Sequence, residues 1–199
     1  MPVSYNFNAI FVHIPKTGGQ SVSSMLKIPK GSMAHFYFEG RTHLTLPMLE
    51  NEYKVDVSDK YIFTFVRNPY TKILSEWAWR MRNIHSTVYN EPTRKVMDFP
   101  EYMETLLSRW DKLVEPHNEK AHVLPQVDFL DERVNVFRYE NFQEDCEYIM
   151  DHLGIKGQVP KVNIGSYTAQ HTKRTIEITR QLYEMDFKAL NYDIDAINF

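Results

Sequence analysis

Seven residues near the N-terminus combine the side chains and the backbone freedom needed to bind an anion. They read PKTGGQS and directly follow the apolar run at residues 9–14. Two consecutive glycines let the backbone turn tightly and approach a ligand with its N–H groups. The lysine adds a full charge, the hydroxyls add donors, and the helix expected next offers its positive N-terminal end. The candidate ligands of a phosphate-like group are therefore Pro15, Lys16, Thr17, Gly18, Gly19, Gln20 and Ser21.

The order of these residues differs from that of the Walker A loop of ATPases and GTPases. That loop has two glycines separated by four residues, and Lys and Ser or Thr follow the second glycine. Here Lys16 precedes both glycines and the loop is shorter. An ordinary ATPase or GTPase is therefore disfavoured.

A second cationic side chain follows another apolar run. Arg67 comes directly after residues 61–66, which read YIFTFV. Open α/β sheets bind ligands at the carboxyl ends of their strands, and the planar guanidinium suits bidentate contact with a phosphate. Ser75 lies eight residues later, about two helical turns into the next helix, where its hydroxyl could face the same anion. Two such sites on neighbouring strands suit a nucleotide that bears phosphates at both its 5′ and 3′ positions.

Short apolar runs that alternate with helical patterns predict the elements that position these residues. Strands are expected at residues 9–14, 61–66 and 134–137. Apolar residues at helical spacing predict helices over residues 20–26, 46–53, 70–84, 99–114, 140–153 and 175–190. Residues 85–100 and 157–173 are expected to be loops. The alternation indicates an α/β fold, a three-layer sandwich with a central, mainly parallel sheet.

Size and composition indicate one ordinary globular domain. The chain has 199 residues, 43% hydrophobic and 25% charged, which predicts a single domain over residues 1–199. Lys and Arg number 23 against 26 Asp and Glu, and this balance disfavours a nucleic-acid binder that works by bulk positive charge. Cys146 is the only cysteine, so the chain has no intramolecular disulfide and no cysteine-based zinc site.

Targeting and membrane-spanning patterns are missing from the sequence. Residues 1–11 lack the basic start and long apolar core of a signal peptide. No apolar run approaches the roughly 18 residues of a membrane span. We therefore expect a cytoplasmic protein without stable membrane insertion. The Asp, Glu and His residues form no metal-binding pattern, so no metal is expected.

Residues 15–21 resemble the 5′-phosphosulfate-binding loop of sulfotransferases, whose common form is PKTGGTS. Residues 66–75, which begin VRNPY and include Ser75, are similar to the 3′-phosphate-binding motif of the same enzymes. The likeness is to the branch that contains heparan sulfate 2-O-sulfotransferase and small bacterial carbohydrate-type enzymes. It continues in residues 122–126, 129–130, 138–142, 186–187 and 191–192.

This resemblance implies a P-loop NTPase-like sulfotransferase fold and the donor 3′-phosphoadenosine 5′-phosphosulfate (PAPS), with PAP as the product. It implies that Lys16 stabilises charge on the leaving phosphate, and that Arg67 and Ser75 bind the 3′-phosphate. Gln20 stands where the family commonly has threonine, and this change leaves the backbone cradle intact. The expected reaction is an in-line displacement by a hydroxyl of a carbohydrate, a lipid or a small metabolite.

A general base is needed to take the proton of the acceptor hydroxyl, and His43 is the first candidate. It lies between the two motifs, and in the 2-O-sulfotransferase relatives a catalytic histidine occupies a similar place. His122, inside a family-like segment, is the second candidate, and the choice between the two stays open. His13 belongs to the first expected strand and is expected to pack against the core.

Two other functions are compatible with such a fold. One is a nucleotide-dependent kinase of a small molecule, which the missing Walker A order and the missing acidic magnesium partner disfavour. The other is a catalytically inactive module that binds PAPS or PAP, which the intact Lys16 and the nearby candidate base disfavour. Residues 85–117 are expected to shape the acceptor site.

Overall fold

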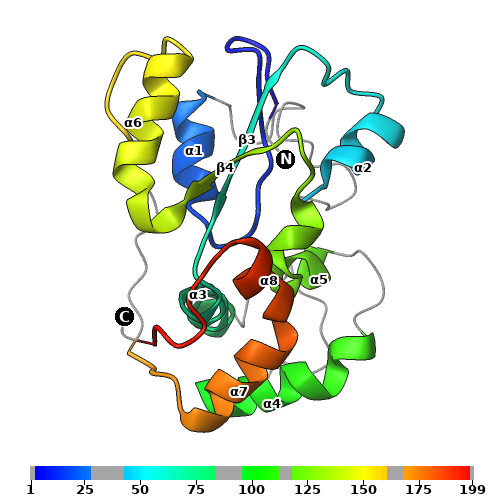
Figure 1. Cartoon of the computed structure of the whole chain (residues 1–199), viewed down its shortest axis with the longest axis vertical. Helices are drawn as coiled ribbons and strands as arrows, with labels where there is room; N and C mark the ends of the chain where they lie inside the picture. Colours follow the sequence, from blue (N-terminus) through cyan, green and yellow to red (C-terminus); the bar gives the residue numbers. More distant parts are fainter. Residues whose placement is uncertain (1–2, 28–42, 84–95, 113–117, 161–167, 198–199) are drawn as a thin grey trace. The chain divides into compact units, whose positions relative to one another are not determined.

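The computed structural model describes residues 3–27, 43–83, 96–112, 118–160 and 168–197 (Figure 1). They belong to two compact units. Unit 1 comprises residues 1–67 and 126–164, and unit 2 comprises residues 68–125 and 165–199.

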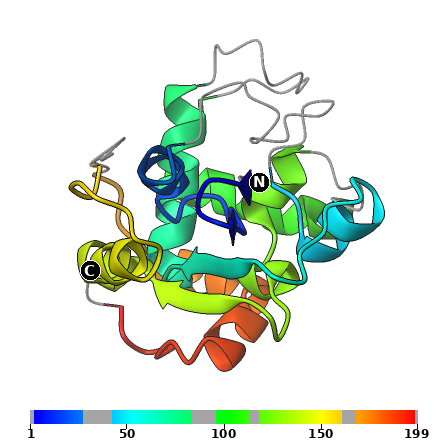
Figure 2. The ribbon, with the colours of Figure 1, turned by 90° about the horizontal axis from the view of Figure 1, so that it is seen from above.

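Unit 1 is built on a four-stranded sheet with the strand order β1-β2-β3-β4. β1 runs antiparallel to β2, whereas the pairs β2–β3 and β3–β4 are parallel. Figure 2 shows β3 and β4 side by side. This sheet confirms the α/β class and the mainly parallel pairing, while the three-layer, P-loop NTPase-like description stays a prediction. The strands are Val3–Ser4, Ala9–Phe11, Tyr61–Val66 and Asn135–Arg138.

The bounds of β3 match the predicted strand, whereas β2 is shorter than the predicted residues 9–14. The Val12 N–H still donates to the Phe63 carbonyl at 2.9 Å, but the Val12 carbonyl accepts from the side chain of Thr64 at 2.6 Å. The Ile14 N–H also donates to the Val12 carbonyl, at 3.1 Å. The chain therefore leaves the sheet after Phe11 because side-chain and turn hydrogen bonds replace the ladder.

β4 was expected as a core strand, and this expectation is wrong. β4 is the last strand in the sheet order, and Val136 is 45% exposed. Apolar residues on an edge strand give the same local pattern as those on a central strand. Phe137 still packs against the core, with its ring centroid 5.8 Å from that of Phe65, and its ring also lies 5.9 Å from that of Tyr148.

Three α-helices of unit 1 are described, α1 (Gly19–Met25), α2 (Leu46–Asn51) and α6 (Phe142–His152). They confirm the helices predicted in these regions, to within a few residues at their ends. Two short 3-10 helices, η3 (Gln126–Phe129) and η4 (Tyr139–Asn141), flank β4 in the chain. The core beneath β2 and β3 is filled from α1 and α6 by Val22, Met25, Cys146, Ile149 and Met150.

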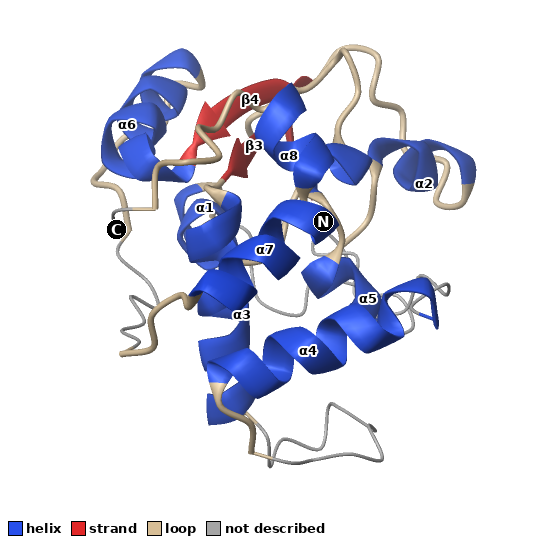
Figure 3. Cartoon of the chain, turned by 60° about the horizontal axis from the view of Figure 1, so that its bottom comes forward, coloured by secondary structure: helices blue, strands red, loops and turns tan. Residues whose placement is uncertain are grey.

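The described part of unit 2 is helical. α3 begins at Pro69, and the Asn68 side chain caps it by accepting from the Tyr70 N–H at 2.9 Å. α4 and α7 lie side by side (Figure 3), and Arg174 of α7 pairs with Glu104 of α4 at 2.7 Å. The elements are α3 (Pro69–Arg82), α4 (Phe99–Arg109), the 3-10 helix η2 (Trp110–Lys112), α5 (Asn118–Val123), α7 (Lys173–Leu182) and α8 (Glu184–Ala189).

The prediction of one continuous helix over residues 175–190 is wrong. The chain forms two helices there, α7 and α8, which are separated at Tyr183. The Tyr183 side chain is buried, and its hydroxyl donates to the Val123 carbonyl at 2.8 Å. This contact with a distant segment fixes the break, and α5, which contains Val123, was also not predicted. Parts of the expected loops 85–100 and 157–173, and the end of the helix expected over 99–114, lie outside the described residues.

None of the described helices has the length and apolar character needed to cross a membrane.

Candidate functional site

The loop between β2 and α1 is held in a strained backbone conformation. Lys16 has a φ of +69° and Gly18 a φ of +86°. A left-handed conformation costs a non-glycine residue about 1–2 kcal/mol, and such strain is most often found at functional sites. Thr17 is fully buried and its hydroxyl donates to the Ile14 carbonyl at 2.8 Å. The threonine hydroxyl therefore closes the turn that sets the backbone of Lys16.

Both glycines of the loop are required by the packing of the protein's own rings. A Cβ on Gly19 would overlap Nε2 of His13, and a Cβ on Gly18 would lie 2.5 Å from Cε2 of Phe142. The space beside the two glycines is therefore filled by an imidazole and a phenyl ring. The sequence argument explained the glycines by the approach of a ligand, and it missed this packing.

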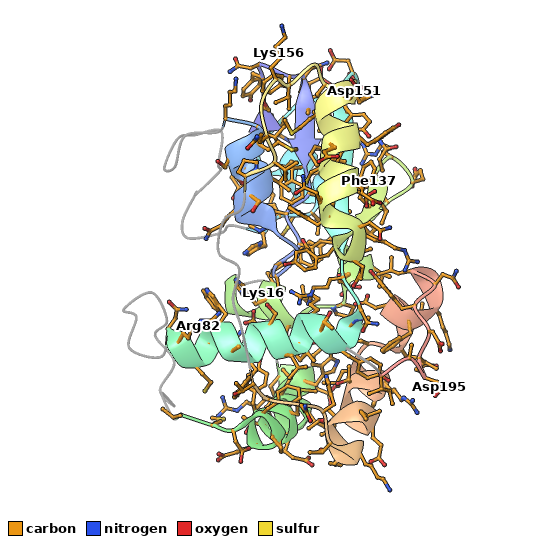
Figure 4. The ribbon with its side chains drawn as sticks, turned by 90° about the vertical axis from the view of Figure 1, so that its left-hand side faces the viewer. Lys16, Arg82, Phe137, Asp151, Lys156 and Asp195 are labelled. Carbon is orange, nitrogen blue, oxygen red and sulfur yellow. The ribbon has the colours of Figure 1, made fainter. Side chains whose placement is uncertain are left out.

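The other polar residues of the loop differ in exposure. Gln20 is exposed, whereas Ser21 is buried, and its N–H donates to the Gly18 carbonyl at 2.9 Å. The N-cap residue of α1 is Gly18, which has no side chain with which to cap the helix. Figure 4 places Lys16 at the end of unit 1 that is distant from Lys156 and Asp151.

Arg67 contacts this loop directly. Its Nη1 donates to the Lys16 carbonyl at 3.2 Å, and its guanidinium carbon lies 4.3 Å from the centroid of the Tyr139 ring. Arg67 follows β3 and Lys16 follows β2, and these neighbouring strands are parallel. The two cationic residues that the sequence singled out are therefore brought together at the carboxyl ends of two adjacent strands.

His43 contacts the residue from which the loop departs. Its Nδ1 lies 2.8 Å from the His13 carbonyl, and the two imidazole rings meet edge to face at 4.5 Å. A carbonyl oxygen only accepts, so Nδ1 of His43 carries the proton in this contact. In the neutral ring the lone pair then resides on Nε2, which is the tautomer that a base acting through Nε2 requires.

Ser75 and His122 belong to unit 2. Ser75 is partly buried on α3, next to the fully buried Glu76. Nδ1 of His122 donates to the Glu76 carboxylate at 2.9 Å, and Arg80 donates to the other carboxylate oxygen at 2.7 Å. The Trp79 ring stacks on His122 at 4.8 Å. The carboxylate thus fixes the orientation of the second candidate base.

Two further observations bear on the chemistry of the described residues. Burial raises the pKa of the Cys146 thiol from its ordinary value of 9.0 to about 12. The thiol is therefore protonated near neutral pH, and a protonated thiol is a poor nucleophile. Within the described ranges, no group of three or more His, Cys, Asp and Glu side chains is arranged to hold a metal ion.

Sequence reasoning missed three residues that contact the loop or Arg67: Gln126, Tyr139 and Phe142. A signal was present, because residues 122–126 and 138–142 both lie in segments that resemble the sulfotransferase family. The resemblance of these segments indicated no role for the three side chains. Their contacts with the loop and Arg67 join residues far apart in the sequence, so only the structure shows them.

Parallel α/β sheets with a cationic loop after a strand are typical of proteins that bind phosphorylated ligands. The sequence matches the model of the sulfotransferase family over residues 3–193, so this chain belongs to the sulfotransferase family. Membership makes the chain a transferase whose general chemistry is the transfer of a sulfuryl group. No curated protein sequence and no solved structure shows a significant match to it.

Proposed function

We propose that this protein transfers the sulfuryl group of PAPS to a hydroxyl of a carbohydrate, a lipid or a small-molecule acceptor by in-line displacement. The observation that carries the proposal is the hydrogen bond from Arg67 to the Lys16 carbonyl, 3.2 Å long. It joins the residues of the two motifs that resemble the 5′- and 3′-phosphate sites of the family. Membership of the sulfotransferase family supports the same reading.

The donor site that we propose follows from the chemistry of the available side chains. A nucleotide with phosphates at its 5′ and 3′ positions needs two cationic sites, and Lys16 and Arg67 supply them. Arg67 suits the 3′-phosphate because a guanidinium binds a phosphate through two parallel N–H donors. Ser75 is assigned to the same phosphate from its place in the motif. The 5′ end is assigned to Pro15, Lys16, Thr17, Gly18, Gly19, Gln20 and Ser21, with the buried Thr17 contributing through its backbone.

Catalysis would divide between two side chains of unit 1. PAPS supplies an activated sulfuryl group whose leaving group is a phosphate. The ammonium of Lys16 stabilises the negative charge that develops on the departing oxygen. Nε2 of His43 accepts the proton of the attacking hydroxyl, because Nδ1 already donates to the His13 carbonyl. Correct placement of the reacting groups provides the rest, as in phosphoryl transfer.

The remaining parts of the proposal come from the sequence. We propose a single domain over residues 1–199 that acts in the cytoplasm without metal or nucleic acid. Part of the segment assigned to the acceptor site, residues 85–117, lies outside the described residues.

Calorimetric titration with PAP tests the donor assignment. We expect binding in the micromolar range by the wild type, and a loss of about 2 kcal/mol, or roughly 30-fold, in Arg67→Ala. Arg133→Ala is the matched control, since Arg133 is an arginine of unit 1 that pairs with Glu50 and Asp131. It should bind PAP as the wild type does.

The alternatives give different outcomes. Binding of ATP with magnesium, without binding of PAP, would replace the sulfotransferase by a kinase. Binding of PAP without transfer from labelled PAPS to any acceptor in a broad hydroxyl screen would leave a nucleotide-binding module.

A further inference from the structure

Gln126 holds the backbone of Arg67 through both of its polar groups. Its side-chain Oε1 accepts from the Arg67 N–H at 2.8 Å, and its Nε2 donates to the Arg67 carbonyl, also at 2.8 Å. The Gln126 side chain is fully buried. One residue of another segment therefore satisfies both backbone groups of Arg67, as a neighbouring strand would do.

The two hydrogen bonds between the Gln126 amide and the Arg67 backbone lie directly beyond the end of β3. β3 stops at Val66, which is paired in register with Arg138 of β4. Buried backbone groups need hydrogen-bond partners. Beyond Val66, the Gln126 amide provides these partners for Arg67 in place of the β4 backbone. Because the NH2 end of the amide only donates and the oxygen end only accepts, only one orientation satisfies both contacts. The amide therefore fixes the position of the Arg67 backbone and the direction in which its side chain leaves.

The other end of Arg67 is fixed by a ring. The guanidinium carbon lies 4.3 Å from the centroid of Tyr139, and Tyr139 packs against Phe142 at 5.5 Å. Phe142 is also the ring that would meet a Cβ on Gly18. Backbone and guanidinium are thus both held before any ligand arrives, and such preorganisation lowers the cost of binding.

We propose that Gln126 is a positioning residue that sets the preference for a nucleotide with a 3′-phosphate over one without it, by fixing Arg67. This inference rests on the proposed function, in which Arg67 binds the 3′-phosphate. Displacement of a binding group by about 1 Å is enough to weaken a bidentate contact strongly. Loss of the amide bridge therefore weakens the 3′-phosphate contact while the rest of the nucleotide site is retained.

The test compares two ligands that differ only in the 3′-phosphate. Dissociation constants of PAP and AMP are measured by calorimetry for the wild type, Gln126→Met, Arg67→Ala and the double variant. Methionine keeps the length of glutamine but removes both hydrogen bonds. We expect Gln126→Met to weaken PAP binding about tenfold, which corresponds to about 1.4 kcal/mol, and to change AMP binding less than about twofold. The double variant should show the same ratio of AMP to PAP dissociation constants as Arg67→Ala.

Asn135→Ala is the matched control, because the Asn135 amide holds the backbone of the same strand at the Ile62 carbonyl, 2.9 Å away. It should leave the AMP-to-PAP ratio unchanged. Thermal unfolding shows whether each variant is folded, and Gln126→Asn, which is too short to reach both groups, replaces Gln126→Met if the latter is not.

The outcomes separate the inference from the function on which it rests. Equal losses of PAP and AMP affinity in folded Gln126 variants would show a merely structural role and overturn the inference. Wild-type affinity for both ligands in those variants, with a reduced ratio of AMP to PAP dissociation constants in Arg67→Ala, would also overturn it. If Arg67→Ala itself leaves the ratio unchanged, the assignment of the 3′-phosphate fails.

Discussion

Lys16 combines a catalytic assignment with an unfavourable backbone conformation. Its φ of +69° is energetically unfavourable for any residue with a Cβ, because the Cβ approaches the following carbonyl oxygen. Glycine has no Cβ and adopts this φ without that strain. Lys16→Gly should therefore be more stable than Lys16→Ala by roughly 1 kcal/mol, as measured by chemical denaturation. Both variants lack the ammonium, so both should lose transfer activity to the same extent.

Lys54 provides the control for this comparison, because it is exposed and has a φ of +54°. Lys54→Gly should relieve strain in the same way and keep full transfer activity. Equal stability of the glycine and alanine variants at position 16 would mean that the loop is not strained there.

His43 is the second residue whose assignment can be tested alone. His43→Ala removes the proposed base and should lower kcat by about 100-fold or more, with little change in PAP affinity because the base acts on the acceptor. The measurement is transfer from labelled PAPS, alongside calorimetry with PAP. His122→Ala is the comparison, and loss of kcat in that variant with normal activity in His43→Ala would move the role of base to His122.

The turn that connects β2 with α1 is an element whose two glycines are explained by packing. A Cβ on Gly19 would overlap the His13 imidazole, and forcing such an overlap typically costs about 1–3 kcal/mol. Gly19→Ala should therefore destabilise unit 1 by that amount in a urea titration. In a His13→Ala background the same substitution should cost clearly less, because the ring is gone.

A double-mutant cycle gives the coupling energy between the two positions. Equal costs of Gly19→Ala in both backgrounds would contradict the packing seen between His13 and Gly19.

At the same scale, the success of sequence reasoning depended on how local the cause of each element was. β3 was predicted to its ends because six apolar or β-branched residues stand directly before Arg67-Asn68-Pro69. The break between α7 and α8 was missed because it depends on the Tyr183 hydroxyl and the Val123 carbonyl, 60 residues apart. β1 has only two residues, too few to show a period.

The candidate site divides in the same way. Lys16 and Arg67 were found because each directly follows an apolar strand pattern, and the fold brings them into contact. Gln126 and Tyr139 act on Arg67 from segments distant in the chain. Neither residue type indicates such a role by itself, so their contacts had to come from the structure.

For the whole molecule, Cys146 reports whether unit 1 is folded. Its pKa is raised to about 12 by burial, so between the ordinary value of 9.0 and about 12 only the unfolded chain loses the thiol proton. Stability should therefore fall as the pH rises through this range. At pH 8 iodoacetamide should label the native protein far more slowly than the protein in urea, as measured by mass spectrometry. Rapid labelling of the native protein would contradict the burial of this thiol.

The division of the chain also separates its natural spectroscopic probes. All three tryptophans, Trp77, Trp79 and Trp110, belong to unit 2, whereas the single thiol belongs to unit 1. Indole fluorescence and thiol reactivity therefore follow different halves of the molecule without any added label. Coincident urea transitions would show one cooperative folding reaction. Separate transitions would let PAP, through the midpoint that it raises, reveal which half contributes most to holding the nucleotide.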